Sequence, residues 1–146
     1  MFQGHFTYQT IVKADKNDVW DFFENPRNLE ELTTFPKVIV LSSDKTDIRE
    51  VVKLRVYAGM ITFSWEAVVT ESKKPHYFVD KGERLPFPLI DWKHQHSFTQ
   101  WGSMTGITDS VYFKSYVPAW IVKAALQQMF KARKQAVKKL FNYSNV

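Results

Sequence analysis

The chain has 146 residues, of which 45% are hydrophobic and 16% aromatic, and its formal net charge is +5 at pH 7. This length suits one domain, which would bury about 70% of the surface of the unfolded chain. The sequence contains no cysteine, which excludes disulfide bonds and thiolate metal sites. Its 12 Phe, 6 Tyr and 5 Trp favour ring-lined walls around an internal space, with an ordinary Phe-rich core as the alternative.

The opening segment MFQGHFTYQT has no basic region followed by an apolar run, so we expect no secretory signal. No apolar stretch approaches the roughly 18 residues that a membrane-spanning helix needs. We therefore expect a cytoplasmic protein without an integral membrane segment.

The first predicted strand covers residues 5–14, followed by two short predicted helices. Asp15 is a suitable N-cap for the first helix, and Asn25 with Pro26 at the next position opens the second. In the strand, the alternation favours an inward face made by Phe6, Tyr8, Thr10 and Val12.

Six predicted strands follow the helices. Residues 37–43 and 49–57 are rich in β-branched side chains and flank a polar stretch at 44–48. Residues 60–71 alternate, with Phe63 and Trp65 on the inward face, and residues 76–82 form a shorter strand. Residues 83–90 contain two prolines, so we expect an irregular loop that either packs as a connection or gates a pocket.

The last two predicted strands form a hairpin, DWKHQHSFTQW-GS-MTGITDSVYF. A two-residue turn at 102–103 makes the residue numbers of facing partners sum to 205, so His96 faces Asp109 and His94 faces Val111. An isolated buried carboxylate is costly, and a histidine directly across the ladder supplies a partner. The sequence therefore predicts a cross-strand His96–Asp109 pair on the inner face of the sheet, between Trp92 and Phe98.

Four roles are open for this pair. The two residues can simply satisfy each other, anchor the polar group of an apolar ligand, act as a general acid and base, or join His94 in a metal site. A zinc site needs three or four ligands, and no further ligand is predicted nearby. We therefore expect no metal and no cofactor.

A long amphipathic helix is predicted over residues 118–141, with Leu126, Met129 and Phe130 on its apolar stripe. Its later turns are basic, which complements the helix dipole. The alternative is transient contact with an acidic membrane surface or partner. Nucleic acid is not an expected partner, because the aromatic residues lie at predicted buried positions. The basic residues are Lys131, Arg133, Lys134, Lys138 and Lys139.

This order of elements resembles the helix-grip fold of the START/Bet v 1-like (SRPBCC) superfamily. The segment GHFTYQTIVKADKNDVWDFFENPRNLEELT resembles its opening strand and helix pair. The segments FVDKG, PFPLIDWKHQHSF and MTGITDSVYF resemble a bacterial polyketide cyclase/dehydrase-like branch, although Leu85 stands where that branch often has glycine. The likeness covers essentially the whole chain. It implies one α+β domain over residues 1–146, with a curved antiparallel seven-stranded sheet around a long C-terminal helix and two short helices after the first strand.

The resemblance and the residues together predict that a small hydrophobic or amphipathic molecule binds between sheet and helix. The alternative is a cyclase/dehydratase-type enzyme acting on a polyketide-like substrate, with His96 and Asp109 as acid/base pair. A third hypothesis is a non-catalytic interaction module that uses the basic helix or the loop at 83–90. The predicted ligand-binding residues are Phe63, Trp65, Phe78, Trp92, His94, His96, Phe98, Asp109, Val111, Leu126, Met129 and Phe130.

Overall fold

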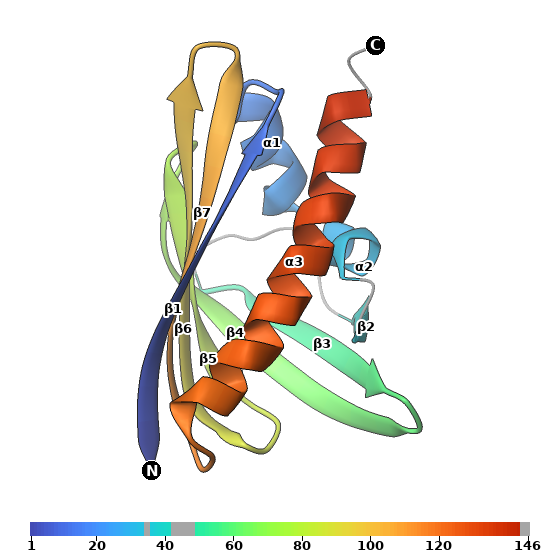
Figure 1. Cartoon of the computed structure of the whole chain (residues 1–146), viewed down its shortest axis with the longest axis vertical. Helices are drawn as coiled ribbons and strands as arrows, with labels where there is room; N and C mark the ends of the chain where they lie inside the picture. Colours follow the sequence, from blue (N-terminus) through green and yellow to red (C-terminus); the bar gives the residue numbers. More distant parts are fainter. Residues whose placement is uncertain (34–35, 42–48, 144–146) are drawn as a thin grey trace.

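A computed structural model describes residues 1–33, 36–41 and 49–143. It has seven strands, a long helix at the carboxyl end and short helices between the first two strands (Figure 1). In chain order the elements are β1 (Phe2–Val12), α1 (Lys16–Glu24), the 3₁₀ helix η1 (Pro26–Asn28), α2 (Leu29–Leu32), β2 (Lys37–Val40), β3 (Val51–Ala58), β4 (Ile61–Lys73), β5 (Tyr77–Arg84), β6 (Leu89–Trp101), β7 (Met104–Ser115) and α3 (Ala119–Tyr143).

The strands form one sheet in the order β1-β7-β6-β5-β4-β3-β2, and every neighbouring pair is antiparallel. In Figure 1, α3 crosses one face of the sheet diagonally beside β1, and α1 and α2 lie on the same side. This arrangement confirms the predicted α+β helix-grip fold. No helix among the described residues is both long enough and apolar enough to cross a membrane.

The predicted helix starts are confirmed. The side chain of Asp15 accepts a hydrogen bond of 2.8 Å from the backbone N–H of Asn17, which caps α1. Asn25 likewise accepts a 3.0 Å hydrogen bond from the backbone N–H of Arg27, with Pro26 at the first helical position. The second helix, however, begins with a 3₁₀ turn, and only Leu29–Leu32 is α-helical.

The β6–β7 hairpin has the predicted register, with Trp101 opposite Met104 and His96 opposite Asp109. Gly102 has a φ of 60°, as the first position of a type II′ turn requires. Alternate residues of β6 are buried, and Tyr112 on the other face of β7 is exposed, so the predicted inward face is correct. The turn and the alternation together determine which side chains reach the interior.

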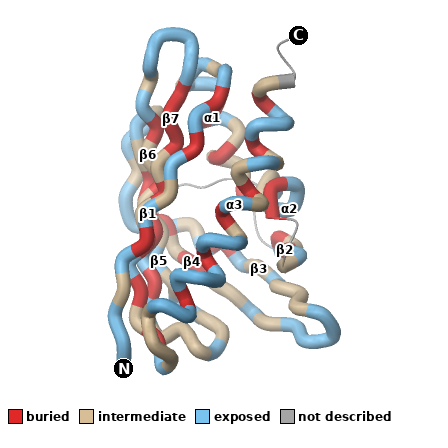
Figure 2. Tube along the Cα trace, in the orientation of Figure 1, coloured by how far each residue is buried: buried red, intermediate tan, exposed pale blue. Residues whose placement is uncertain are grey.

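Two clusters of buried side chains form the core. One joins α1, the β6–β7 hairpin and the end of α3, where Trp20 makes edge contacts with Phe78 and Phe98. The other lies between β1, β6, β7 and the earlier turns of α3, centred on Phe130, which is 1% exposed. Figure 2 shows the resulting alternation of buried and exposed residues along the strands and α3.

The basic residues of α3 differ in their exposure to solvent. Lys131, Lys138 and Lys139 are exposed as expected, but Arg133 is only 7% exposed and belongs to the interior. Contact of the basic helix with a membrane surface stays a prediction.

The irregular loop is shorter than predicted and lies between Arg84 and Leu89. Leu85 packs over β5, where a Cβ on Gly82 would lie 2.5 Å from its side chain. Residues 42–48, which include the predicted polar stretch, lie outside the described residues.

Candidate functional site: a cavity with a buried charge cluster

A cavity of about 440 Å³ lies between the sheet and α3. This volume is in the range of small-molecule sites. Its walls are mainly apolar, and its charged or titratable lining residues are Asp80, His94, His96 and Arg133. The apolar lining comes from β3 (Val52, Leu54, Val56), β4 (Trp65, Ala67, Val69), α3 (Ile121, Val122, Ala125, Leu126, Met129), the helices after β1 (Phe23, Pro26, Leu29), and Pro36, Val38, Phe78, Pro86, Pro88, Leu89, Trp92 and Val117.

The hollow lies under β3, β4, β5 and β6, not under β1 and β7. On β1, Phe6 and Tyr8 reach the helix and contact the ring of Phe130 at centroid distances of 5.6 and 5.8 Å. Among the described lining residues none belongs to β1 or β7. The inward residues of β3 and β4 include Val52 and Ala67, whose side chains are too short to fill the same gap.

Seven of the twelve predicted ligand-binding residues line the cavity: Trp65, Phe78, Trp92, His94, His96, Leu126 and Met129. The other five do not. Phe98 packs against Trp20 in the core, Val111 and Phe130 are buried between β7 and α3, and Phe63 is only partly buried on β4. Asp109 is buried on β7 and reaches the cavity only through the histidines that line it.

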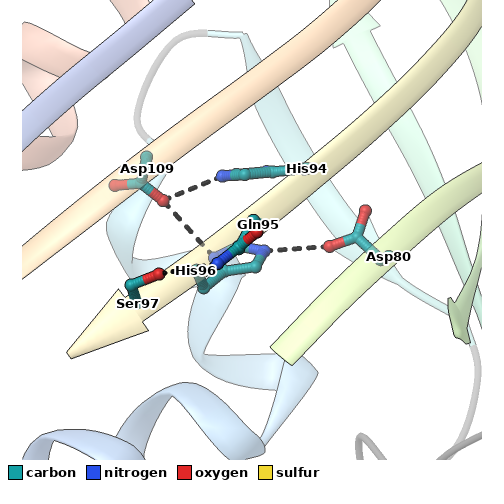
Figure 3. A network of polar contacts seen from close by, with 6 residues as sticks. All are labelled: Asp80, His94, Gln95, His96, Ser97 and Asp109. Atoms are coloured by element: carbon teal, nitrogen blue, oxygen red, sulfur yellow. Dashed lines mark hydrogen bonds and ion pairs between the residues drawn. The ribbon is translucent and has the colours of Figure 1, made fainter. Parts of the chain in front are cut away.

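The two histidines and two aspartates form a continuous polar cluster, shown in Figure 3. Nε2 of His94 lies 2.8 Å from Oδ1 of Asp109, and Nε2 of His96 lies 2.9 Å from Oδ2 of Asp80. Nδ1 of His96 faces Oδ1 of Asp109 at 3.4 Å, an ion-pair contact without hydrogen-bond geometry. The predicted His96–Asp109 pair is therefore present, but the shorter contact of Asp109 is with His94.

The pairing across the strands is diagonal. In the ladders, His96 stands opposite Asp109 and His94 stands opposite Asp80. Each histidine nevertheless makes its hydrogen bond to the aspartate opposite the other histidine, and the two imidazole rings stack at a centroid distance of 3.7 Å. Diagonal neighbours are within reach of long side chains, so register alone does not determine the partner.

Sequence reasoning missed Asp80, although a signal was present. Phe78 was predicted to face inward, and Asp80 follows it by two residues on the same strand. Residues two apart on a strand share a face, so the alternation places Asp80 beside the histidines.

Burial and pairing act against each other on the aspartates. Burial alone would raise the pKa of Asp109, but the hydrogen bonds and charges of His94 and His96 outweigh it and hold that pKa well below the ordinary range. Burial would likewise raise the pKa of Asp80, and His96 lowers it. Both carboxyl groups are therefore ionised at neutral pH.

The pKa values of the two histidines shift in opposite directions. Burial would lower the pKa of His96, but the carboxylates of Asp109 and Asp80 on its two sides raise it. For His94, burial and the neighbouring charge of His96 lower the pKa, and Asp109 opposes them only in part. The surroundings therefore favour the protonated form of His96 and the neutral form of His94.

Arg133 was predicted at the surface but lies in the interior. Its guanidinium lies 5.6 Å from the ring centres of both Phe23 and Phe130, and burial lowers its pKa, against the opposing charges of Asp109 and Asp80. Helical spacing gave the signal, because Arg133 continues the buried stripe of Leu126, Phe130 and Val137. A long basic side chain on a basic helix was wrongly assigned to the surface.

The ligand atoms of Asp80, His94 and His96 lie within 4.8 Å of one another, a spacing that one metal ion could bridge. The Nε2 atoms of both histidines already contact carboxylates, and the buried charge of Arg133 opposes a further cation. Each imidazole thus donates or accepts one hydrogen bond with a carboxylate through its Nε2.

Solved structures with the same fold come from distant proteins. Protein Ms6760 from Mycobacterium smegmatis has a TM-score of 0.71 at 17% identity, covering 96% of this chain and 92% of that one. Ginseng major latex-like protein 151 from Panax ginseng has a TM-score of 0.74 at 11% identity, covering 95% and 97%. The di-domain ARO/CYC StfQ of the steffimycin biosynthetic pathway has a TM-score of 0.76 at 10% identity, covering 98% of this chain and 52% of that one.

No family model and no curated protein sequence matches the chain. At 10 to 17% identity the structural matches show a shared fold. This agrees with the START/Bet v 1-like resemblance seen in the sequence. Fold alone does not fix activity, so function has to be argued from the cavity and its polar cluster.

Proposed function

We propose that the chain binds a small hydrophobic or amphipathic molecule in the cavity between the sheet and α3. The observation that carries the proposal is a mainly apolar hollow of about 440 Å³ bordered by a few convergent polar groups. Close packing is the rule for protein interiors, and a hollow of this size is far larger than ordinary packing defects. Apolar walls supply affinity by burying ligand surface, and polar groups orient the ligand.

The contrast between the two sides of the sheet supports this proposal. The same helix packs directly against β1, through Phe6 and Phe130, and spans a hollow opposite β3 and β4. A chain under selection for stability alone would fill such a hollow, because each missing contact weakens the core. The latex-like protein and StfQ share the overall fold of this chain.

Native mass spectrometry of the freshly purified protein tests the proposal, together with binding of the uncharged fluorescent probe N-phenyl-1-naphthylamine. We expect a retained small molecule or saturable probe binding. Val52→Phe, which projects a ring into the cavity, should abolish both signals. Val51→Phe is the matched control, because Val51 is 37% exposed on the other face of the same strand. Absence of both signals in the wild type, or their survival in Val52→Phe, would overturn the proposal.

A cyclase/dehydratase-type activity is the second candidate, and the His94–Asp109 contact favours it. His94 lines the cavity, is neutral, and directs Nε2 to a buried carboxylate, so its other nitrogen is available as a base. In an intramolecular aldol condensation, His94 would take a proton from the carbon between two carbonyl groups. That carbon would bond to a distant ketone carbon, and the proton would return to the resulting alkoxide oxygen. His94 would then take the second proton from the same carbon and pass it to the new hydroxyl group, which leaves as water as the carbon–carbon double bond forms. His96 was the proton carrier predicted from the sequence, in an acid/base pair with Asp109, but carboxylates face both of its nitrogens.

This second candidate is tested by incubating the protein with a linear poly-β-ketone thioester and following cyclised product by mass spectrometry. His94→Gln should retain binding of the naphthylamine probe and lose product formation. Turnover equal to wild type in His94→Gln, or no turnover in the wild type, would exclude this mechanism.

A further inference from the structure

The guanidinium of Arg133 contains a buried donor, Nη2, that has no acceptor among the described residues. The residue is 7% exposed, and Nη2 has neither solvent contact nor a hydrogen bond. Among the described residues, none accepts a hydrogen bond from Arg133, and no carboxylate lies within ion-pair distance of it. The rings of Phe23 and Phe130 flank the guanidinium, and Nη2 between them has no hydrogen-bond acceptor.

Such an arrangement is unfavourable unless something supplies an acceptor. Leaving a buried donor without a partner costs about 1–3 kcal/mol, and more for a charged group. Arg133 lines the cavity, so an acceptor bound there lies beside its side chain, and a rotation of the guanidinium between the two rings would turn Nη2 toward it. A bound molecule with an oxygen atom would meet this requirement.

The charges around the cavity indicate whether that oxygen should be ionised. Two carboxylates, Asp80 and Asp109, lie in the cluster. Both ring nitrogens of His96 face them, at 2.9 and 3.4 Å, an arrangement that suits the doubly protonated ring. The positive charges of a doubly protonated His96 and of Arg133 then balance the negative charges of Asp80 and Asp109. An anionic ligand would add an uncompensated charge beside Asp80, which lines the same cavity.

We propose that the ligand is an uncharged amphipathic molecule, with an apolar body and a carbonyl-type oxygen that accepts hydrogen bonds from Arg133. This inference rests on the proposed function, since it specifies what the cavity binds. Esters, ketones and amides share the required chemistry. Free fatty acids and other carboxylates do not.

Competition against N-phenyl-1-naphthylamine tests the inference with three probes of one chain length: methyl decanoate, decanoate and decane. We expect methyl decanoate to displace the probe about tenfold or more better than decane, as a hydrogen bond to a charged donor implies. It should also displace the probe better than decanoate. Decanoate binding tighter than the ester, or ester and alkane binding equally, would overturn the inference.

Arg133→Met removes the donors and keeps a flexible apolar side chain between the two rings. This variant should bind methyl decanoate and decane within about twofold of each other while still binding the naphthylamine probe. Lys131→Met is the matched control, since it removes a positive charge from an exposed position of the same helix and should leave the ester preference intact. A preserved ester preference in Arg133→Met would assign the acceptor contact elsewhere and overturn the inference. Failure of the naphthylamine probe in the wild type would instead count against the proposed function.

Discussion

The two sides of the sheet meet the same helix in different ways. On the closed side, β1 and β7 direct large side chains such as Phe6 and Phe113 into a buried cluster with Phe130 of α3. On the open side, β3 and β4 carry shorter inward residues, including Val52 and Ala67, and border the cavity. One helix over one sheet thus yields a packed core and a binding space. The difference indicates that short side chains such as Val52 and Ala67 contribute to the hollow on the open side.

We expect the largest difference between the two sides in the stability effects of substituting two neighbouring residues of α3. Phe130 belongs to the closed side, whereas Met129 borders the cavity and is only partly buried. Phe130→Ala should lower the free energy of unfolding by about 3–5 kcal/mol, because it opens a void in a filled region. Met129→Ala should lower it by only about 1 kcal/mol, because its surroundings are already hollow. Urea unfolding followed by circular dichroism measures both, and equal losses would mean that the two sides are equally packed.

The two aspartates sharpen the comparison at the polar cluster. Asp109 on β7 has a side chain 7% exposed and faces both histidines, while Asp80 on β5 is 18% exposed and faces one. Removing one partner of a buried ion pair leaves the other unpaired, so Asp109→Asn should cost about 3 kcal/mol of unfolding free energy. Asp80→Asn should cost about 1 kcal/mol, since water in the cavity can hydrate His96. Thermal and urea denaturation would contradict this order if Asp80→Asn were the more damaging change.

A matched pair of valines tests the volume argument from the other direction. Val111 on β7 is fully buried and Val52 on β3 lines the cavity. Val111→Phe should destabilise the protein by about 1–3 kcal/mol through overpacking. Val52→Phe should leave unfolding free energy unchanged within about 0.5 kcal/mol and abolish probe binding. A destabilisation of Val52→Phe as large as that of Val111→Phe would show that the open side has no spare room.

The smallest expected effect is a pH dependence carried by His96, the residue that joins the aspartate of the closed side to that of the cavity. Its folded-state pKa is raised, so its stabilising contribution is complete below the ordinary histidine pKa of about 6.5 and is lost as pH rises through the folded-state value. Between pH 6.5 and 8.5 the wild type should lose at most about 1 kcal/mol of unfolding free energy per pH unit. His96→Gln should remove this decline.

His94 provides the internal control for that experiment. Its lowered pKa gives a contribution that is present above about pH 6.5 and is lost as pH falls, so it acts on the other side of the same range. His94→Gln should therefore retain the decline above pH 6.5. A flat wild-type curve over this range would contradict the assignment of a protonated His96.

Much of the fold followed from local patterns in the sequence. The alternation in β6 and β7 and the Gly102–Ser103 turn determined the hairpin register, and the cap residues Asp15 and Asn25 located the helix starts. Each of these signals depends on nearby residues only. This explains why they could be recognised without a structure.

The site was predicted less completely, because it depends on side-chain contacts that join three neighbouring strands, β5, β6 and β7, and α3. The hydrogen bonds of His94 and His96 run diagonally between strands. Asp80, which bonds His96, lies on β5, and in the sequence an irregular loop separates β5 from β6. The aromatic residues were expected to wall the cavity, but Phe98 and Phe130 fill the core. Volume and diagonal reach are three-dimensional quantities, and alternation does not encode them.

The Gly82–Leu85 contact fixes the loop that carries two prolines of the cavity wall. Leu85 rests on β5 in the space left by the missing Cβ, and the nearby Pro86 and Pro88 line the cavity. A Cβ at position 82 would lie 2.5 Å from the Leu85 side chain, so Gly82→Ala would displace Leu85 and shift the two prolines. The shape of the binding space thus depends on a glycine that does not itself line it.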